Sequence, residues 1–193
     1  MKAKVAIAGD GNVGSNLQKG LSKAGYEATA VGREPKKLRE KALEASIIVL
    51  AVPFGAVDDT LRELGDAVNG KILVDATNRL DKSMHLQPGP ASGAEELQKK
   101  VPKAKVVKAL NTTFAATMSH GAAKGGEKIT IFAASDDKDA RKTVAQMARD
   151  IGFDAVEAGP LRNAQYLEAL AVLNIQLAYA EGFGAEMGFR LAR

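Results

Sequence analysis

The sequence predicts an α/β protein of the Rossmann type, with a doubly wound, mainly parallel sheet and a helical appendage at the C-terminus. Three observations support this prediction. Apolar runs of strand length alternate with helical segments along most of the chain. Several of these runs are continuously apolar, as expected for strands covered on both faces of a sheet. The glycine-rich stretch GDGNVG, at residues 9–14, separates the first strand from the first helix.

The first half of the chain supplies four strands and three helices. The expected strands, each a short apolar run, are residues 4–8, 28–31, 47–52 and 72–74. The expected helices, whose apolar residues recur at helical spacing, are residues 13–24, 35–45 and 56–64. Pro35 suits the first turn of a helix, and Gly25 suits the position after one.

The second half continues the alternation after residues 78–92, which form the longest segment without a pattern. The expected helices are residues 94–100 and 138–151, and the expected strands are residues 105–107, 129–133 and 154–156. Gly152 suits the end of the second of these helices.

The alternation stops after residue 159. Residues 161–180 are expected to form one long helix with an apolar stripe of Leu167, Leu170, Leu173 and Leu177. This helix is more apolar than a solvated surface helix, so its stripe should contact another subunit or close a ligand pocket. We therefore expect a dinucleotide-binding domain at residues 1–159 and, at residues 160–193, a helical segment that closes the pocket and forms a homodimer.

Composition restricts the class of protein. The 193 residues carry a net charge of +4 without basic blocks or interleaved aromatic residues, so no nucleic-acid partner is expected. The chain has no cysteine, which excludes disulfides and thiolate chemistry. His85 and His120 lie far apart without carboxylates at ligand spacing, so we expect no metal site. The sequence contains no signal-peptide pattern and no membrane span, and we expect a cytoplasmic protein without a membrane partner.

The GDGNVG stretch matches the GxGxxG pattern of dinucleotide-binding turns. In such a turn Gly9 permits the tight bend, Gly11 allows close approach of the pyrophosphate, and Gly14 lets the helix pack on the strand. The alternative is a glycine-rich turn without a ligand. The position between a strand and a helix favours a dinucleotide, because phosphate would meet the free N–H groups of the helix.

The end of the second strand favours NADP over NAD. Arg33 follows this strand, and Lys37 follows one helical turn later. Arg33 is suited to stack on adenine and pair with a 2′-phosphate, whereas Glu34 is expected to point away. Beyond the third strand, Ala51, Val52, Pro53 and Phe54 stand at the edge where ligands of such sheets bind, although Phe54 is explained almost as well as a core aromatic.

These segments, with AKVVKALNTTFA from residue 104, FAASDDKDA from residue 132, AGPLRNAQYLEAL from residue 158 and GFGAEMGFRL near the end, resemble a known family. The chain is similar to the deazaflavin-dependent NADP reductases, which exchange a hydride between NADP(H) and coenzyme F420, and to their flavin-reducing and uncharacterised relatives. The resemblance covers nearly the whole chain.

The resemblance implies specific contacts for the bound NADP. Its pyrophosphate would lie on the backbone of Asp10, Gly11, Asn12 and Val13, and its 2′-phosphate on Gly32, Arg33 and Lys37. Val52 and Phe54 would line the cofactor, Ala133 would stand near the nicotinamide, and Asn111, Thr112 and Thr113 would border the same pocket. Residues 187–189 would enclose the ring of the second substrate, which is coenzyme F420, FMN or FAD.

This sequence departs from the family pattern at three places. Asp10 stands where family members often carry a small hydroxylated residue, and its carboxylate is expected to face solvent or a cation. Gly32 lacks a hydroxyl for the 2′-phosphate. The DATNRL segment at residues 75–80 resembles the broader dinucleotide-binding relatives instead.

Hydride transfer between two stacked rings requires a separation of about 3–3.5 Å and exclusion of water, with little acid-base catalysis. We therefore assign no catalytic residue, and His120 is the one titratable candidate for a proton shuttle. Two alternatives stay open. One is a reductase of another small substrate, such as an imine or a pyrroline carboxylate, and the other is a non-catalytic NADP-binding redox sensor.

Overall fold

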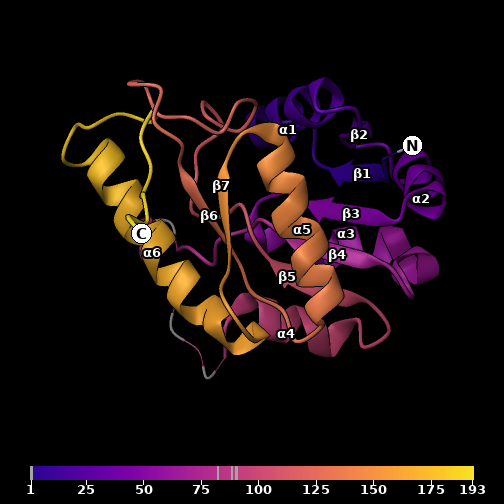
Figure 1. Ribbon diagram of the computed structural model, residues 1–193. Helices are drawn as coiled ribbons and strands as arrows, with labels where there is room; N and C mark the ends of the chain where they lie inside the picture. The colour runs from indigo at the N-terminus through magenta and orange to yellow at the C-terminus, as the bar shows by residue number, and fades with distance from the viewer. Residues whose placement is uncertain (1, 82, 88, 90) are drawn as a thin grey trace.

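A computed structural model describes residues 2–81, 83–87, 89 and 91–193. Strands and helices alternate along the chain (Figure 1). The strands are β1 (Lys4–Ala8), β2 (Glu27–Val31), β3 (Ile47–Leu50), β4 (Ile72–Asp75), β5 (Lys105–Lys108), β6 (Thr130–Ala133) and β7 (Asp154–Glu157). The α-helices are α1 (Asn12–Lys23), α2 (Pro35–Glu44), α3 (Val57–Leu64), α4 (Gly93–Lys100), α5 (Lys138–Ile151) and α6 (Ala164–Tyr179).

Five strands form a parallel sheet in the order β2-β1-β3-β4-β5. Within this sheet Val5 of β1 pairs with Ala28 of β2 on one side and with Ile47 of β3 on the other. The order of the strands reverses direction between β1 and β3, and in sheets of this kind such a reversal opens a crevice at the carboxyl ends. The predicted Rossmann-type fold is therefore confirmed, and the crevice lies beside the glycine-rich turn.

Helices cover both faces of the sheet, and each face has its own apolar core. On one face Val5, Ile7 and Val49 pack with α1 and α5 through side chains such as Leu17 and Met147. On the other face the alternate strand residues, among them Ile48 and Leu50, pack with α2, α3 and α4. This double coverage explains why the strands read as continuous apolar runs.

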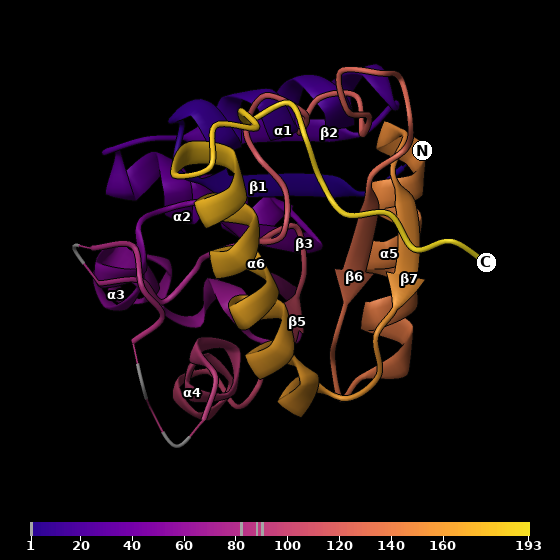
Figure 2. The same ribbon diagram turned by 90° about the vertical axis from the view of Figure 1, so that its left-hand side faces the viewer.

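β6 and β7 form a separate parallel pair. Figure 2 shows the two strands running across the direction of β1. The pair joins the main sheet at one antiparallel bridge, where the N–H of Lys108 donates to Ala134 O at 2.9 Å and the N–H of Ala134 donates to Lys108 O at 3.0 Å. The bridge lies at the carboxyl end of β5, and the chain after Ala134 continues antiparallel to β5, where Ser135 Oγ donates to Val106 O at 2.6 Å.

The C-terminal helix α6 lies against the carboxyl edge of β4 and β5 (Figures 1 and 2). It begins at Ala164, later than expected, because residues 161–163 form a 3-10 turn after Pro160. Only Leu167 of the expected leucine stripe is buried, while Leu173 is 47% exposed. Within the described part of the chain, no helix is long and apolar enough to cross a membrane.

Candidate functional site

The turn between β1 and α1 requires two of its glycines for purely structural reasons. Gly9 has a φ of +107°, and its N–H donates to Val31 O at 2.8 Å, which ties the turn to the end of β2. A Cβ on Gly9 would overlap the carbonyl of Ala51, and a Cβ on Gly14 would overlap the carbonyl of Gly9. A glycine at either position therefore says nothing about a ligand.

Gly11 is different. Its backbone is extended, with φ −66° and ψ −171°, a conformation open to any residue. A Cβ placed on it would meet no atom of the described residues within 4 Å. The protein itself does not require glycine here, so the missing side chain is best explained by close approach of a ligand.

The first turn of α1 fits a phosphate group. Among the described residues, no side chain caps this helix and no acidic residue lies in its first turn. The N–H groups at the start of α1 therefore keep their hydrogen-bonding capacity, and the helix dipole adds partial positive charge there. Asn12 and Val13 begin the helix, so the backbone predicted to hold a pyrophosphate is available for it.

A cavity of about 510 Å³ adjoins this turn, within the size range of small-molecule sites. The turns after β1, β2 and β3 form one side of it, and α2 and α3 form the other. The residues that line it are Ala8, Gly9, Asp10, Gly11, Gly32, Arg33, Pro35, Leu38, Ala51, Val52, Pro53, Ala56, Asp59, Thr60 and Glu63. Eight residues from the sequence prediction are among them: Gly9, Asp10, Gly11, Gly32, Arg33, Ala51, Val52 and Pro53. The contributions of α2 and α3 were not anticipated, because they depend on how these helices pack.

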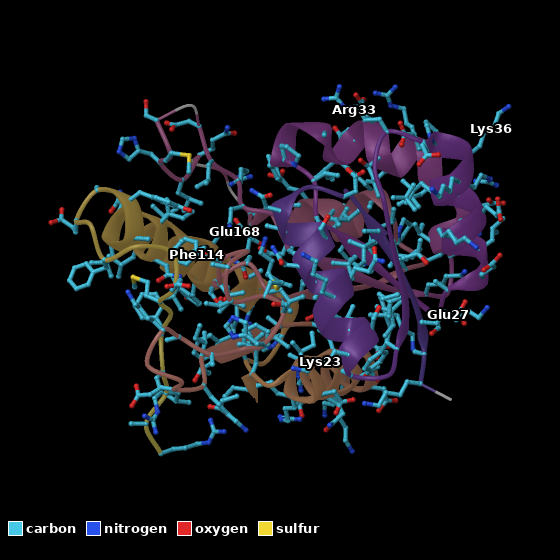
Figure 3. All side chains as sticks on the ribbon, turned by 90° about the horizontal axis from the view of Figure 1, so that it is seen from above. Lys23, Glu27, Arg33, Lys36, Phe114 and Glu168 are labelled. Atoms are coloured by element: carbon cyan, nitrogen blue, oxygen red, sulfur yellow. The ribbon has the colours of Figure 1, made fainter. Side chains whose placement is uncertain are left out.

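The two basic residues after β2 differ in position and in availability, since Arg33 lines the cavity and Lys37 does not. Arg33 is exposed and extends outward (Figure 3), and it has no ion pair within the described residues. Lys37 instead contacts Glu34, with an Nζ to Oε1 distance of 3.1 Å. Glu34 is exposed too, so this ion pair is weak and the ammonium of Lys37 can exchange partners.

The other seven predicted residues are not among those that line this cavity: Asn12, Val13, Gly14, Lys37, Phe54, Asn111 and Ala133. Phe54 contributes to a separate space of about 170 Å³ between α3 and α4, where its ring lies next to Gly93. Ala133 is fully buried in the core beneath α5. The strand β6 does end beside the carboxyl end of β5, but the side chain of Ala133 lies in the core with Val107 and Leu110 and does not line the cavity.

His120 and the C-terminal tail also lie away from this cavity. His120 is exposed, and its ring contacts its own loop, with Nε2 3.1 Å from Ala116 O. The tail runs beside β6, where the N–H of Thr130 donates to Phe189 O at 2.9 Å. Gly188 in this tail packs against Ile129.

A buried ionic cluster stands at the carboxyl ends of β4 and β5. Nζ of Lys108 lies 2.9 Å from Asp75 Oδ2 and 3.2 Å from Glu168 Oε1. All three side chains are 2% exposed or less, and Glu168 lies inside the molecule in Figure 3. Glu168 also accepts from the N–H of Gly93 at 3.0 Å, so the cluster joins α6 and α4 to the sheet.

Polar side chains with unused hydrogen-bonding capacity surround the loop after β5. Asn111 donates to Leu167 O at 2.9 Å, and Asn174 donates to Thr112 O at 3.1 Å. Their side-chain oxygens and the hydroxyl of Thr112 are buried without a partner among the described residues. Leu110, before this loop, has a φ of +67°, which is strained for a leucine. Buried unpaired polar atoms and local strain occur together at functional sites, so this loop extends the candidate site toward α6.

Comparison with known proteins identifies a family and several relatives. The family described as NADP oxidoreductase, coenzyme F420-dependent, matches residues 4–79. The F420-dependent NADP reductase of Methanocaldococcus jannaschii is 29% identical over 164 residues, covering 81% of this chain and 71% of the reductase. The metalloreductase STEAP3 of Rattus norvegicus is 30% identical over 181 residues, covering 86% of this chain and 36% of that protein. The chain thus spans about a third of the metalloreductase.

One solved structure matches over the full length. It is a crystal structure from Arthrobacter sp. FB24, named for a proposed F420-dependent NADP reductase, with 30% identity and a TM-score of 0.86. The match covers 100% of both chains, including α6 and the tail.

Proposed function

Because this chain belongs to the family of coenzyme F420-dependent NADP oxidoreductases, we propose that it transfers a hydride between NADP(H) and a second ring, either coenzyme F420 or a flavin such as FMN or FAD. Bound NADPH would supply the hydride at C4 of its nicotinamide ring. The observation that carries the proposal is Gly11, whose missing side chain no neighbouring atom requires and which opens onto the cavity. The full-length match to the Arthrobacter structure supports the choice of acceptor.

The residues present fit NADP. The backbone of residues 9–14 would hold the pyrophosphate, since the first turn of α1 is uncapped among the described residues. Gly32, Arg33 and Lys37 would meet the 2′-phosphate, and Val52 and Pro53 would form the wall beside the cofactor. On this proposal Asn111 borders the nicotinamide end, where its unpaired oxygen accepts a hydrogen bond from the ligand. The roles of Phe54 and Ala133 are not part of the proposal, because Phe54 lines a separate space and Ala133 is fully buried in the core.

The C-terminal segment, residues 160–193, is proposed to close the reacting end of the site and to form a homodimer. The inner side of α6 is fixed on the carboxyl edge by Glu168 and Asn174. The helix and the turn after it also expose four large apolar side chains: Tyr166 at 66%, Leu173 at 47%, Tyr179 at 66% and Phe183 at 71%. Exposed large apolar side chains that gather on one element are a feature of subunit interfaces and support the proposed homodimer.

The test is rapid mixing of the purified protein and NADPH with coenzyme F420, FMN or FAD in separate reactions. The proposal predicts loss of NADPH absorbance with at least one acceptor and reduction of that acceptor in equal amount. The variant Gly11→Ala tests the site, because the structure leaves room for its Cβ whereas a bound phosphate would meet it. NADPH that binds but stays unoxidised with all three acceptors would refute the reductase function and leave dinucleotide binding in place.

A further inference from the structure

The carboxylate of Asp10 lies directly over Gly32. A methyl group built on Gly32 would overlap both carboxylate oxygens of Asp10. The position of Asp10 is set by its neighbours, because the preceding Gly9 is bonded to the end of β2 and Ser15 Oγ donates to Asp10 O at 2.6 Å. The turn between β1 and α1 therefore places the carboxylate of Asp10 at the carboxyl end of β2.

An acidic group at the carboxyl end of the second strand has a known role in dinucleotide-binding sites. NAD-binding sheets commonly place an Asp or Glu at the end of the second strand, where it accepts hydrogen bonds from the hydroxyls of the adenosine ribose. Here β2 ends at Val31, and Gly32 and Arg33, which follow it, line the cavity, whereas no acidic residue of this segment is among the residues described as lining it. Because Gly32 has no side chain, the carboxylate of Asp10 occupies the space that a β2 side chain would fill.

We propose that Asp10 determines the dinucleotide specificity of this protein: it accepts hydrogen bonds from the adenosine ribose of NAD(H) and opposes the 2′-phosphate of NADP(H), so that the site binds both. This inference rests on the proposed function, since it needs a dinucleotide in the cavity. Arg33, from the adjacent position, retains the ability to pair with a 2′-phosphate. At the adenosine ribose, Asp10 therefore favours the free hydroxyls of NAD(H), and Arg33 favours the 2′-phosphate of NADP(H).

The charges around the cavity support weak selection for the extra phosphate. Asp10, Asp59 and Glu63 line it, against Arg33 as the basic residue of the lining. Lys37, the second base expected near the phosphate, is shared with Glu34 at 3.1 Å. A dianionic 2′-phosphate bound here would be attracted by the guanidinium of Arg33 and repelled by the nearby carboxylate of Asp10. The ribose hydroxyls of NAD(H) would instead donate hydrogen bonds to Asp10 without this repulsion.

Equilibrium titration with NADPH and NADH, followed by fluorescence or calorimetry, tests the inference without relying on turnover. The wild-type protein should bind NADPH no more than about tenfold more tightly than NADH, a difference of about 1.4 kcal/mol. Asp10→Asn removes the charge and keeps the shape, and it should strengthen NADPH binding about five- to tenfold while weakening NADH binding. Arg33→Ala should do the reverse, weakening NADPH selectively.

Asp58→Asn is the control for charge alone. Asp58 lies next to Asp59 on α3 but outside the cavity, where it pairs with Lys100 at 2.5 Å. It should leave the NADPH to NADH ratio unchanged. A wild-type preference for NADPH above about a hundredfold, or an Asp10→Asn variant with an unchanged ratio, would overturn the specificity role and leave the reductase function standing. A protein that binds neither dinucleotide would overturn both.

Discussion

The buried cluster of Lys108, Asp75 and Glu168 permits a quantitative prediction for the substitution Lys108→Met. The ammonium of Lys108 is the group that compensates both carboxylates, at 2.9 and 3.2 Å, and it also donates to Thr77 O at 2.6 Å. Methionine has a similar length and no charge. The variant therefore leaves two carboxylates facing each other in a site without solvent.

Removal of one partner from a buried ion pair costs about 3–5 kcal/mol, because the remaining charge is left uncompensated. For a chain of this size each kcal/mol lowers the melting temperature by about 2–4 °C, so Lys108→Met should melt about 6–20 °C below the wild type. Glu168→Gln should cost less, under about 2 kcal/mol, because the Lys108–Asp75 pair survives and the new amide oxygen still accepts from Gly93.

Lys105→Met is the matched control. Lys105 lies on the same strand, but its side chain is 46% exposed and pairs with Asp137 at 3.0 Å. An exposed pair contributes about 1 kcal/mol or less, so this variant should melt within about 4 °C of the wild type. Urea unfolding followed by circular dichroism supplies the free energies. Equal losses for the two lysine variants, or a stabilised Lys108→Met, would refute the view that Lys108 compensates buried negative charge.

Three further predictions concern the turn, one helix cap and the surface of α6. Gly11→Ala should change the free energy of unfolding by no more than about 1 kcal/mol and weaken NADPH binding, because the fold leaves room for its methyl group. Gly14→Ala should unfold at lower denaturant because its methyl group overlaps Gly9 O, and similar unfolding of both variants would contradict the distinction. The N–H of Ala140, followed by Lys105, holds the pKa of Asp137 below its ordinary 3.8, so its contribution to stability is full above that value and is lost as the pH falls through the lowered pKa. Asp137→Asn, which keeps the cap, should be less stable than the wild type in urea at neutral pH and equal to it at the acid end; a constant difference would argue against this linkage. Leu173→Glu should convert the proposed dimer to a monomer in analytical ultracentrifugation, while Leu43→Glu on α2, where the leucine is 57% exposed against 47% for Leu173, should not.

Local sequence patterns predicted most of the fold. The apolar runs at β1 and β3 read as buried strands because α1 and α5 cover one face and α2, α3 and α4 cover the other. The glycine-rich turn was recognisable because Gly9 and Gly14 satisfy local steric constraints that only glycine meets. Arg33 was found by its position after a strand, which the sequence also reveals.

These local sequence patterns could not predict which distant residues contact one another. Lys108 and Asp75 lie 33 positions apart, on neighbouring strands whose register sets their contact, and Glu168 joins them from a helix much later in the chain. Ala133 is buried in the core that includes Val144 of α5, and the composition of a strand does not reveal which helix will cover it.

For Asp10, the sequence determines one part of its role and the tertiary structure determines the other. The sequence alone determined that a carboxylate stands in the first turn of a dinucleotide-type motif, since the motif is local and its spacing is set by backbone geometry. Only the tertiary structure decided that this carboxylate lies on Gly32 beside Arg33, because that contact follows from the pairing of β1 with β2 and from the missing side chain on the second strand. The spacing of apolar residues predicts which face of each segment is buried in the core. Strand order and register determine which side chains contact one another at a site, and the spacing does not reveal them.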